Sequence, residues 1–202
     1  MTRTVAAFDF DGTLTRGDTL VPFLAWGFGR RRVATALTAA APAMAVAART
    51  GNRDAAKESL LTRVIGGRAH DEVLERGRGF GQRLARHGIT ADMSARLAWH
   101  RVREHELAIV SASLDVYLLE LASRIDIHHV VCSTLEVVDG VCTGRLAGGN
   151  CRGVEKATRL HALLGGDAVE LWAYGNSRGD HEMLALADHP VRVRRGRIIS
   201  AV

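Results

Sequence analysis

Cysteine is scarce in this chain of 202 residues, and the three that occur, Cys132, Cys142 and Cys151, show no CxxC spacing. An odd number of separated thiols argues against a zinc site and fits a reducing compartment. The first residues also lack the charged start and apolar segment of a secretory signal. We therefore expect a cytoplasmic protein that builds its core without disulfides or structural metal.

Lysine is almost absent: of the 27 basic residues only Lys57 and Lys156 are lysines. The basic residues exceed the 22 acids and give a formal charge of +5, so a nucleic-acid-binding module is one hypothesis. The arginines are dispersed, however, and no aromatic platform for stacked bases is evident, so we expect no nucleic-acid partner. In such a chain each lysine is a candidate for a specific role, because a compact ammonium differs chemically from a guanidinium.

A long uninterrupted apolar run is also missing. The longest, at 33–48, has 16 residues, is mostly alanine and contains Pro42. A membrane-spanning helix needs about 20 apolar residues, so we expect no stable membrane insertion. We interpret the run as a buried or partly exposed helical hairpin, and favour core packing over contact with a lipid acyl chain.

The sequence does contain apolar strands that alternate with helical patterns. Short β-branched runs predict strands, and the Asp139-Gly140 turn predicts a hairpin. Strands are expected at 3–10, 106–113, 128–133, in the hairpin 135–146, at 169–175 and in a closing pair at 190–202. Helices are expected at 19–28, 32–48, 52–65 (capped by Asn52), 70–87, 91–103, 114–125, 154–165 and from His181 onward.

Strands that alternate with helices imply an α/β fold with a Rossmann-like parallel sheet. The block 18–87 interrupts this alternation, because its patterns are all helical. We therefore predict a discontinuous core, made of 1–17 and 88–202, and an inserted all-helical cap at 18–87. The oligomeric state is left open.

The stretch FDFDGTLT, at 8–15, places two acids at the carboxyl end of the first expected strand. Alternate residues of a strand share a face, so Phe8 and Phe10 point one way and Asp9 and Asp11 the other. Ligands of open α/β sheets bind at this end of the strands. Two carboxylates there can act as a nucleophile and a proton shuttle, and they also suit Mg²⁺.

Three further motifs follow in order. Ser111 ends the apolar strand in AIVSAS, Lys156 stands near a helix start in GVEKATRL, and GNSRGD carries Asn176 and Asp180. Together with DFDGTLT, these motifs resemble the haloacid-dehalogenase superfamily over almost the whole chain. The chain is most similar to the branch with a helical cap that contains phosphoserine phosphatase. Ser113, by contrast, is expected only to cap the helix that follows it.

This resemblance implies an Mg²⁺-dependent phosphomonoesterase for a small phosphorylated metabolite. Asp9 would attack phosphorus to form an aspartyl-phosphate, and Asp11 would protonate the leaving oxygen and then activate water. Ser111 and Lys156 would hold the phosphoryl oxygens, since phosphoryl transfer depends mainly on positioning and charge neutralisation. The implied metal ligands are Asp9, Asp11, Asn176 and Asp180, and further contacts to substrate are expected from Gly12, Thr13 and Ala112.

Substrate choice is expected to lie in the cap. Asp18 matches the acid that holds the substrate amine in phosphoserine phosphatase, and Arg63 resembles its cap arginine for the carboxylate. Helix capping by Asp18 and simple surface charge at Arg63 are equally open. Asn176 stands where the family usually has an aspartate, and its uncharged amide weakens the expected metal site. The alternative enzyme is a phosphatase of a lipid phosphate such as phosphatidylglycerophosphate.

Overall fold

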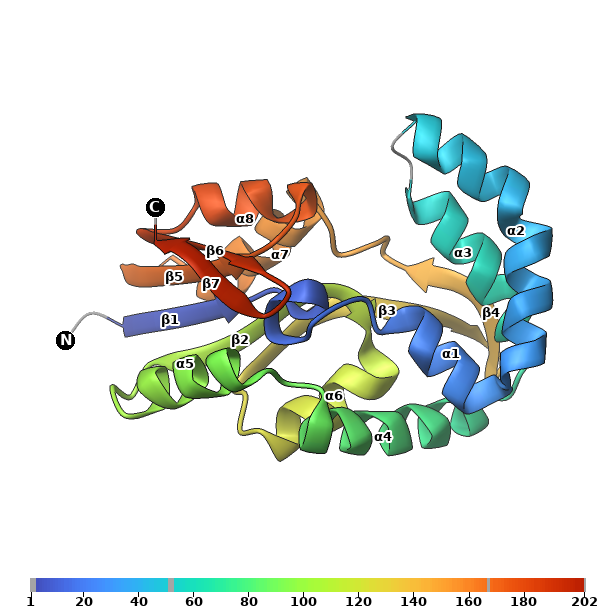
Figure 1. The fold of residues 1–202 in the computed structure, drawn as a ribbon, viewed down its shortest axis with the longest axis horizontal. Helices are drawn as coiled ribbons and strands as arrows, with labels where there is room; N and C mark the ends of the chain where they lie inside the picture. The colour runs from blue at the N-terminus through green and yellow to red at the C-terminus, as the bar shows by residue number, and fades with distance from the viewer. Residues whose placement is uncertain (1–2, 51–52, 167, 202) are drawn as a thin grey trace.

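The computed structural model describes residues 3–50, 53–166 and 168–201, whose strands form one central sheet (Figure 1). The strands are β1 (Arg3–Phe8), β2 (Glu106–Leu114), β3 (His129–Val138), β4 (Val141–Ala147), β5 (Val169–Gly175), β6 (His189–Arg194) and β7 (Arg197–Ala201). Their order across the sheet is β4-β3-β2-β1-β5-β6-β7. The five inner strands run parallel, and the edge strands β4 and β7 are antiparallel to their neighbours.

Helices cover both faces of this sheet (Figure 1). They are α1 (Leu20–Phe28), α2 (Arg30–Thr50), α3 (Arg53–Val64), α4 (His70–His87), α5 (Ala91–Arg101), α6 (Asp115–Arg124), α7 (Val154–Leu164) and α8 (His181–Ala185), with short turns η1 (Phe10–Leu14) and η2 (Arg178–Asp180). Helices α7 and α8 pack on one face, while α5 and α6 pack on the other. The predicted α/β fold with a Rossmann-like sheet is confirmed.

The first strand shows why the sheet forms where it does. Val5 and Ala7 belong to the apolar cluster beneath α7 and α8, while Ala6 and Phe8 belong to the cluster on the opposite face. A strand buried on both faces must be apolar at every position, which is what a central parallel strand requires. The first acidic residue, Asp9, therefore comes directly after β1, at the carboxyl ends of the strands.

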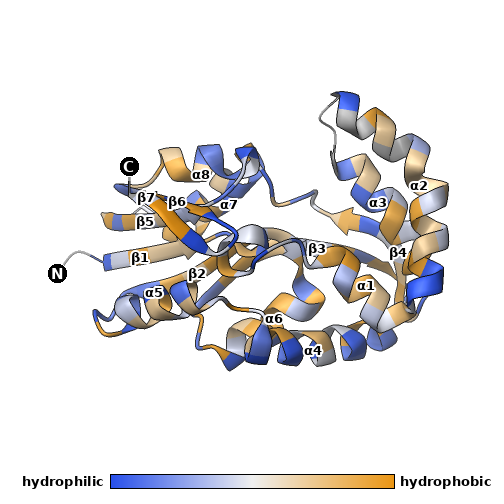
Figure 2. Ribbon diagram, viewed as in Figure 1, coloured by the Kyte–Doolittle hydropathy of each residue, from blue (hydrophilic) through white to orange (hydrophobic). Residues whose placement is uncertain are grey.

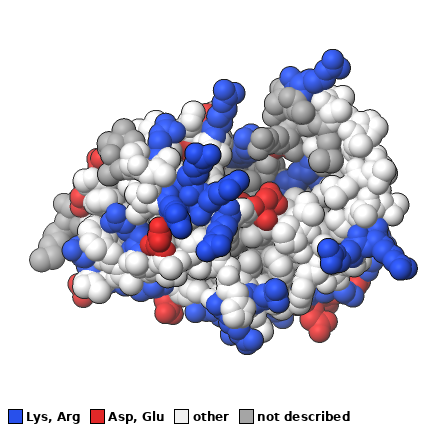
Figure 3. Space-filling view, in the orientation of Figure 1, with Lys and Arg blue, Asp and Glu red and all other residues white. Residues whose placement is uncertain are grey.

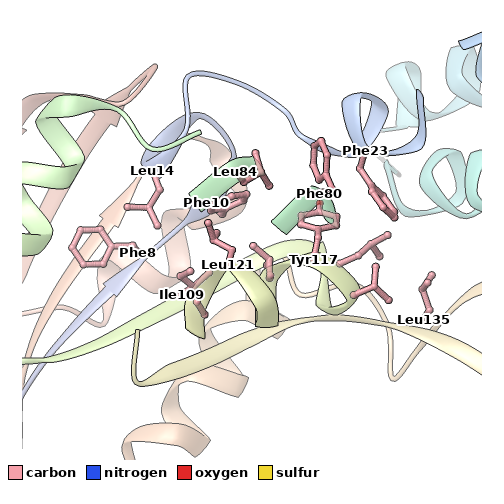
Figure 4. Packing of buried hydrophobic residues seen from close by; sticks show 14 of the residues in the cluster. Phe8, Phe10, Leu14, Phe23, Phe80, Leu84, Ile109, Tyr117, Leu121 and Leu135 are labelled. Carbon is pink, nitrogen blue, oxygen red and sulfur yellow. The ribbon is translucent and has the colours of Figure 1, made fainter. Parts of the chain in front are cut away.

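An aromatic cluster joins the first helix to the core (Figure 4). The ring of Phe23, from α1, lies with its centroid 5.5 Å from that of Phe80 on α4 and 5.1 Å from that of Tyr117 on α6. The rings of Phe80 and Tyr117 meet edge to face at 5.6 Å. These separations are the ones that aromatic pairs prefer, so the cluster fixes α1 beside the carboxyl end of the sheet.

Helix α4 lies close against α6 because its inner side carries glycines. A Cβ atom at Gly77 would collide with the Val116 carbonyl, and one at Gly81 would lie 2.6 Å from the Tyr117 carbonyl oxygen. Figure 2 shows hydrophilic residues along the outer side of α4. The stretch RGRGFGQR is thus a helix with a close-packed inner face.

Helices α1, α2 and α3 form a group beyond the carboxyl ends of the strands (Figure 1). The apolar run at 33–48 is partly exposed, and core packing, the favoured account, holds for only part of it: of the α2 side chains that the structure describes, only Val33, Ala36 and Ala40 are buried. The helix also continues through Pro42 instead of turning there, and the hairpin is made by α2 and α3 together. The predicted cap on α3, Asn52, lies outside the described residues.

Two sheet details differ from the sequence-based expectation. The separate strands expected at 128–133 and 135–138 are one long strand, β3, whose pairing shifts register along its length. The predicted hairpin at Asp139-Gly140 and the closing pair β6–β7 are both present. The hairpin β3–β4 extends beneath α3, where the Glu58 carboxylate accepts a hydrogen bond from the backbone of Leu146 at 3.0 Å.

Candidate active site

Three charged side chains meet at the carboxyl end of the sheet. Asp9 follows β1, Asp180 ends η2, and Lys156 lies near the start of α7. The Lys156 Nζ donates hydrogen bonds to Asp9 Oδ1 at 2.8 Å and to Asp180 Oδ1 at 2.5 Å. All three side chains are buried. Burial would lower the pKa of Lys156, but the two carboxylates outweigh it and raise the pKa, so the ammonium keeps its charge.

The loop after β5 holds Asp180 in place. Its Oδ2 accepts hydrogen bonds from the backbone of Asn176 at 3.1 Å and from both the backbone and the hydroxyl of Ser177 at 2.9 Å. Burial would raise the pKa of Asp180, but Lys156 and the hydrogen bonds from Ser177 hold that pKa below its ordinary value. For Asp9 burial dominates and raises the pKa, against the opposing effect of Lys156.

Asp11 has a separate set of partners. Its Oδ2 accepts a hydrogen bond from Ser113 Oγ at 2.6 Å, and its Oδ1 accepts bonds from the Thr19 backbone at 2.9 Å and hydroxyl at 2.7 Å. Burial, followed by the negative charge of Asp18, raises the pKa of Asp11 to about 7. Asp11 can therefore carry a proton near neutral pH while Asp9 is ion-paired, which is how two neighbouring acids come to have two chemical roles.

The expectation that Ser113 caps the following helix is wrong. Helix α6 begins after Leu114 without any side-chain cap, and the Ser113 hydroxyl is directed at Asp11 instead. Ser111, two residues earlier, is buried, and its Oγ accepts a hydrogen bond from the backbone of Ser113 at 3.1 Å. The two serines of β2 thus face the acids of β1, because β1 and β2 are parallel neighbours in the sheet.

The η1 turn requires glycine. Gly12 has a φ of +79°, and a Cβ there would collide with the side-chain amide of Asn176. That amide Nδ2 donates to the Asp11 carbonyl oxygen at 2.7 Å, so it joins the first and fourth motifs. Thr13 is buried, and its hydroxyl donates to Asp9 Oδ2 at 2.9 Å. Thr13 therefore reaches the site through Asp9.

A pocket of about 550 Å³ opens over these groups. Asp18 lines it and also accepts a hydrogen bond from the Leu20 backbone at 2.9 Å, so it both faces the pocket and stabilises the start of α1. The structure brings together nine of the residues singled out in the sequence: Asp9, Asp11, Gly12, Asp18, Ser111, Ala112, Lys156, Asn176 and Asp180.

Arg63 does not join them. It lies near the end of α3, where its guanidinium bonds to the carbonyl oxygen of Ser59 one turn earlier, and it lines a different hollow together with Arg32 and Thr35. The structure gives it no contact with the pocket over Asp9. A side chain from the helical group that does contact a pocket residue is Lys57, through the Ala112 carbonyl.

Lys57 is not among the site residues that the sequence predicts, although the scarcity of lysine marks each lysine as a candidate for a specific role. From α3 its Nζ donates hydrogen bonds to the Ala112 carbonyl oxygen at 2.5 Å and to Asn150 Oδ1 at 2.9 Å. Burial lowers the pKa of Lys57 to about 8. Asn150 in turn donates to Asp54 Oδ1 at 2.6 Å, so a polar cluster ties α3 to the end of β2 and to the loop before α7.

The donor set at Asp9 and Asp180 fits a hard cation. Within the described part of the chain, no three carboxylate, imidazole or thiol side chains converge to hold a metal by themselves. Two carboxylates are present, however, and the Asp11 carbonyl and the Asn176 amide supply neutral oxygens beside them. Mg²⁺ typically binds through one or two carboxylates and completes its shell with water and substrate phosphate. The residues therefore suit Mg²⁺ better than a softer metal.

Comparison with known proteins places this geometry in a family. Residues 6–185 match the model of the haloacid dehalogenase-like hydrolases. Protein CicA of Caulobacter vibrioides is 32% identical over 195 residues, which cover 96% of this chain and 87% of that protein. The chain belongs to the haloacid dehalogenase-like hydrolase family, as its motifs predict.

Solved structures share the fold at low sequence identity. A protein of unknown function from Bordetella pertussis Tohama I has a TM-score of 0.68 and 22% identity, over 95% of this chain and 89% of that one. A phosphoserine phosphatase in its apo form has a TM-score of 0.60 and 17% identity, over 95% and 85% of the two chains. A phosphoserine phosphohydrolase-like protein from Francisella tularensis has a TM-score of 0.66 and 15% identity, over 95% and 86%.

Proposed function

We propose that this protein is an Mg²⁺-dependent phosphomonoester hydrolase that acts through an aspartyl-phosphate on a small phosphorylated metabolite. The main observation behind the proposal is that the two acids after β1 have different partners. Asp9 is paired with Lys156, while Asp11 is held apart by Ser113 and Thr19. A nucleophile beside a fixed cation, next to an acid that can hold a proton, is what stepwise phosphoryl transfer needs.

The proposed reaction has two steps. An Asp9 carboxylate oxygen forms a bond to phosphorus, the bond from phosphorus to the ester oxygen breaks, and Asp11 gives its proton to the leaving alcohol. Water then attacks the phosphorus of the aspartyl-phosphate and gives a proton to Asp11, which releases phosphate and restores Asp9. Lys156 and the Ser111 hydroxyl neutralise and orient the phosphoryl oxygens in both steps.

The metal would be held by Asp9, Asp180, the Asp11 carbonyl and Asn176. When bound, Mg²⁺ would supply positive charge beside the phosphoryl oxygens. Support for the covalent route also comes from a related fold: a phosphoserine phosphatase with a TM-score of 0.61 to this chain was solved as a phospho-aspartyl intermediate analogue. In this proposal α1, α2 and α3 belong to a cap over the pocket, and the boundaries 18–87 stay a prediction.

A lipid phosphate is the second candidate substrate. Val21 and Trp26 on α1 and Val46 on α2 are exposed apolar side chains in the helical group beside the pocket. Such residues can lie against acyl chains at an interface. None of the described helices is long and apolar enough to cross a membrane. Hydrolysis of phosphatidylglycerophosphate in micelles, compared with soluble esters, separates the two candidates.

The test is phosphate release from a panel of phosphate monoesters, with Mg²⁺ and with EDTA. The panel contains phosphoserine, sugar phosphates and a lipid phosphate. We expect Mg²⁺-dependent release that disappears in Asp9→Asn and persists in Asp71→Asn, an exposed aspartate on α4. Release that survives in Asp9→Asn would show that the nucleophile is wrong. If no ester is hydrolysed, Asn176→Asp tests whether the uncharged amide limits metal binding.

A further inference from the structure

Four arginines surround the mouth of the pocket over Asp9. Arg16 follows η1, Arg152 precedes α7, and Arg194 and Arg195 stand at the tip of the β6–β7 hairpin. We call this set the arginine rim. Figure 3 shows basic side chains gathered over the hairpin tip on this face, beside a small acidic patch. The rim comes from three separate segments, so it is not the exposed face of one helix.

Among the described residues, no carboxylate pairs with any rim guanidinium, although such pairs occur elsewhere. Arg3 pairs with Glu106 at 2.7 Å, and Arg159 pairs with Glu155 at 2.7 Å. Inside the pocket Lys156 is neutralised by two aspartates. The rim guanidinium groups are therefore not held in ion pairs within the described part of the chain, and they are available to an anion, although aspartates line the pocket beside them.

The backbone of the hairpin tip is fixed against the site. The Gly196 N–H donates to the Gly12 carbonyl oxygen at 3.1 Å, and the Thr90 hydroxyl donates to the Gly196 carbonyl oxygen at 2.8 Å. These bonds place Arg195 directly beside the η1 turn. A fixed backbone reduces the entropy lost when a side chain binds its ligand.

Arg195 also occupies a position that its side chain does not favour. It has a φ of +50° and precedes Gly196 with a φ of +72°, as in a two-residue turn that usually takes Asn-Gly. A non-glycine residue there costs about 1 kcal/mol or more. An arginine at a strained turn, lining the pocket, points to a role for its guanidinium.

The position of Arg152 also depends on its local surroundings. A Cβ at Gly179 would lie 2.8 Å from the Arg152 Nε and 2.9 Å from its Cγ. The side chain therefore lies flat over a glycine of the loop that carries Asp180. It reaches the pocket only because residue 179 has no side chain.

From these observations we propose that the arginine rim binds a second phosphate group of the substrate, beside the phosphate that is removed. The proposal rests on the phosphatase function above. A carboxylate is satisfied by one bidentate guanidinium, whereas a phosphate monoester offers three terminal oxygens and up to two charges, and a diester holds its two terminal oxygens in a tetrahedral arrangement that separate guanidinium groups can approach. A pocket of about 550 Å³ suits a small bisphosphorylated molecule better than a macromolecular surface. The second phosphate can belong to a soluble metabolite or to a lipid headgroup.

The test compares matched substrate pairs. The soluble pair is fructose 6-phosphate and fructose 1,6-bisphosphate, and the lipid pair is phosphatidic acid and phosphatidylglycerophosphate in neutral micelles. In at least one pair we expect kcat/KM to be about tenfold or more higher for the substrate with two phosphates, as for one charge-assisted hydrogen bond. The pair that shows the preference identifies the source of the second phosphate.

Arg195→Asn tests the rim directly, because asparagine tolerates a positive φ and removes the charge without straining the turn. We expect this variant to fold normally and to lose the preference about tenfold, as for one such bond. Arg192→Ala, at an exposed arginine of β6 that does not line the pocket, should keep the preference. Equal losses for both members of a pair, or no preference in either pair, would overturn the proposal.

Binding of inorganic pyrophosphate and phosphate, measured by calorimetry without turnover, separates this proposal from the proposed function. If no ester is hydrolysed but pyrophosphate binds more tightly than phosphate and Arg195→Asn removes the difference, the rim stands and the phosphatase reaction fails. If esters are hydrolysed without any such difference, the rim proposal fails alone. Loss of binding to single-stranded DNA or anionic vesicles in Arg195→Asn, with unchanged substrate preference, would assign the rim to a macromolecular surface instead.

Discussion

Ser113 shows how one hydroxyl can divide the roles of two acids. The Ser113 hydroxyl donates a hydrogen bond to Asp11 at 2.6 Å, while Lys156 donates one to Asp9. Removing the hydroxyl in Ser113→Ala leaves one oxygen of the half-buried Asp11 carboxyl without a donor and frees the Asp11 side chain to rotate. We expect kcat to fall about tenfold or more, the value of one hydrogen bond to a charged group, while KM changes little.

Steady-state kinetics on the best ester of the panel measures this effect. Ser123→Ala, at an exposed position on α6, the helix that follows β2, is the matched control and should retain full activity. A rise in KM at constant kcat in Ser113→Ala would mean that Ser113 contacts substrate and does not position Asp11.

We expect His100 to make the free energy of unfolding depend on pH. Its ring is buried, and its Nε2 lies 2.8 Å from the Tyr174 hydroxyl. Burial, followed by the nearby charges of His105, Arg96 and Arg103, lowers the pKa of His100 to about 3 from an ordinary value of 6.5. Between these values the unfolded chain binds more protons, so the free energy of unfolding rises with pH.

Urea unfolding between pH 5 and 6.5 should therefore show stability falling as the pH falls, with His100 contributing up to about 1.4 kcal/mol per pH unit. His100→Gln should be less stable but should flatten this slope, because it no longer titrates. His161→Gln removes an exposed histidine and should leave the slope unchanged. An unchanged slope in His100→Gln would show that another group causes the dependence.

The site residues that could be predicted from the sequence are those whose motif fixes both residue type and place in the chain. Asp9, Ser111 and Lys156 sit at strand ends or a helix start, and the sheet topology brings such positions together. Thr19 and Lys57 could not be placed, because their contacts depend on how α1 and α3 meet the core. Contacts between distant segments leave no periodic trace in a single sequence.

Most helices and strands were predictable because their sequence patterns fix their type and their place in the chain. Packing explains the exceptions. The run at 33–48 is apolar in sequence, but alanine is compatible with exposure, and among its described side chains only Val33, Ala36 and Ala40 are buried. The strand β3 reads as two strands because its pattern changes where its pairing shifts register. Each error arises where a neighbouring element, and not the local sequence, decides burial.

The close contact of α4 with α6 leads to a prediction about helix packing. Gly81→Ala would place a methyl group 2.6 Å from the Tyr117 carbonyl oxygen, so the helices would have to separate. We expect a loss of about 1–3 kcal/mol in the free energy of unfolding, despite the better helix propensity of alanine. Tyr117 also contacts Thr19, so the shift should weaken activity as well.

Gly79→Ala is the matched control, since its methyl group would meet only the ring tip of the half-exposed Trp26, at 2.7 Å. Denaturant unfolding of both variants should therefore show a much smaller loss for Gly79→Ala. Equal losses would mean that the inner face of α4 is not the tight contact.

The protein taken as a unit combines a net positive charge with a pocket lined by four aspartates. Mg²⁺ should bind there and not to the basic surface, and a ligand that binds only the folded state raises its stability. At about one hundred times its dissociation constant, we expect Mg²⁺ to add about 2.7 kcal/mol and to raise the melting temperature. EDTA should reverse the rise.

Thermal melting with Asp180→Asn and Asp71→Asn completes this test without any assay of turnover. Asp180→Asn should abolish the response to Mg²⁺, and Asp71→Asn should keep it. A response that survives in Asp180→Asn would place the cation elsewhere.

The scarcity of lysine has a practical consequence for following the motion of α3 in solution. Both side-chain amines are held by specific partners: Lys156 lies in the pocket between two carboxylates, and Lys57 lies between the Ala112 carbonyl at the end of β2 and Asn150. An amine-selective acylating reagent therefore meets no background from other lysines. The rate at which Lys57 is acylated, measured by mass spectrometry, would report how often α3 moves away from the end of β2.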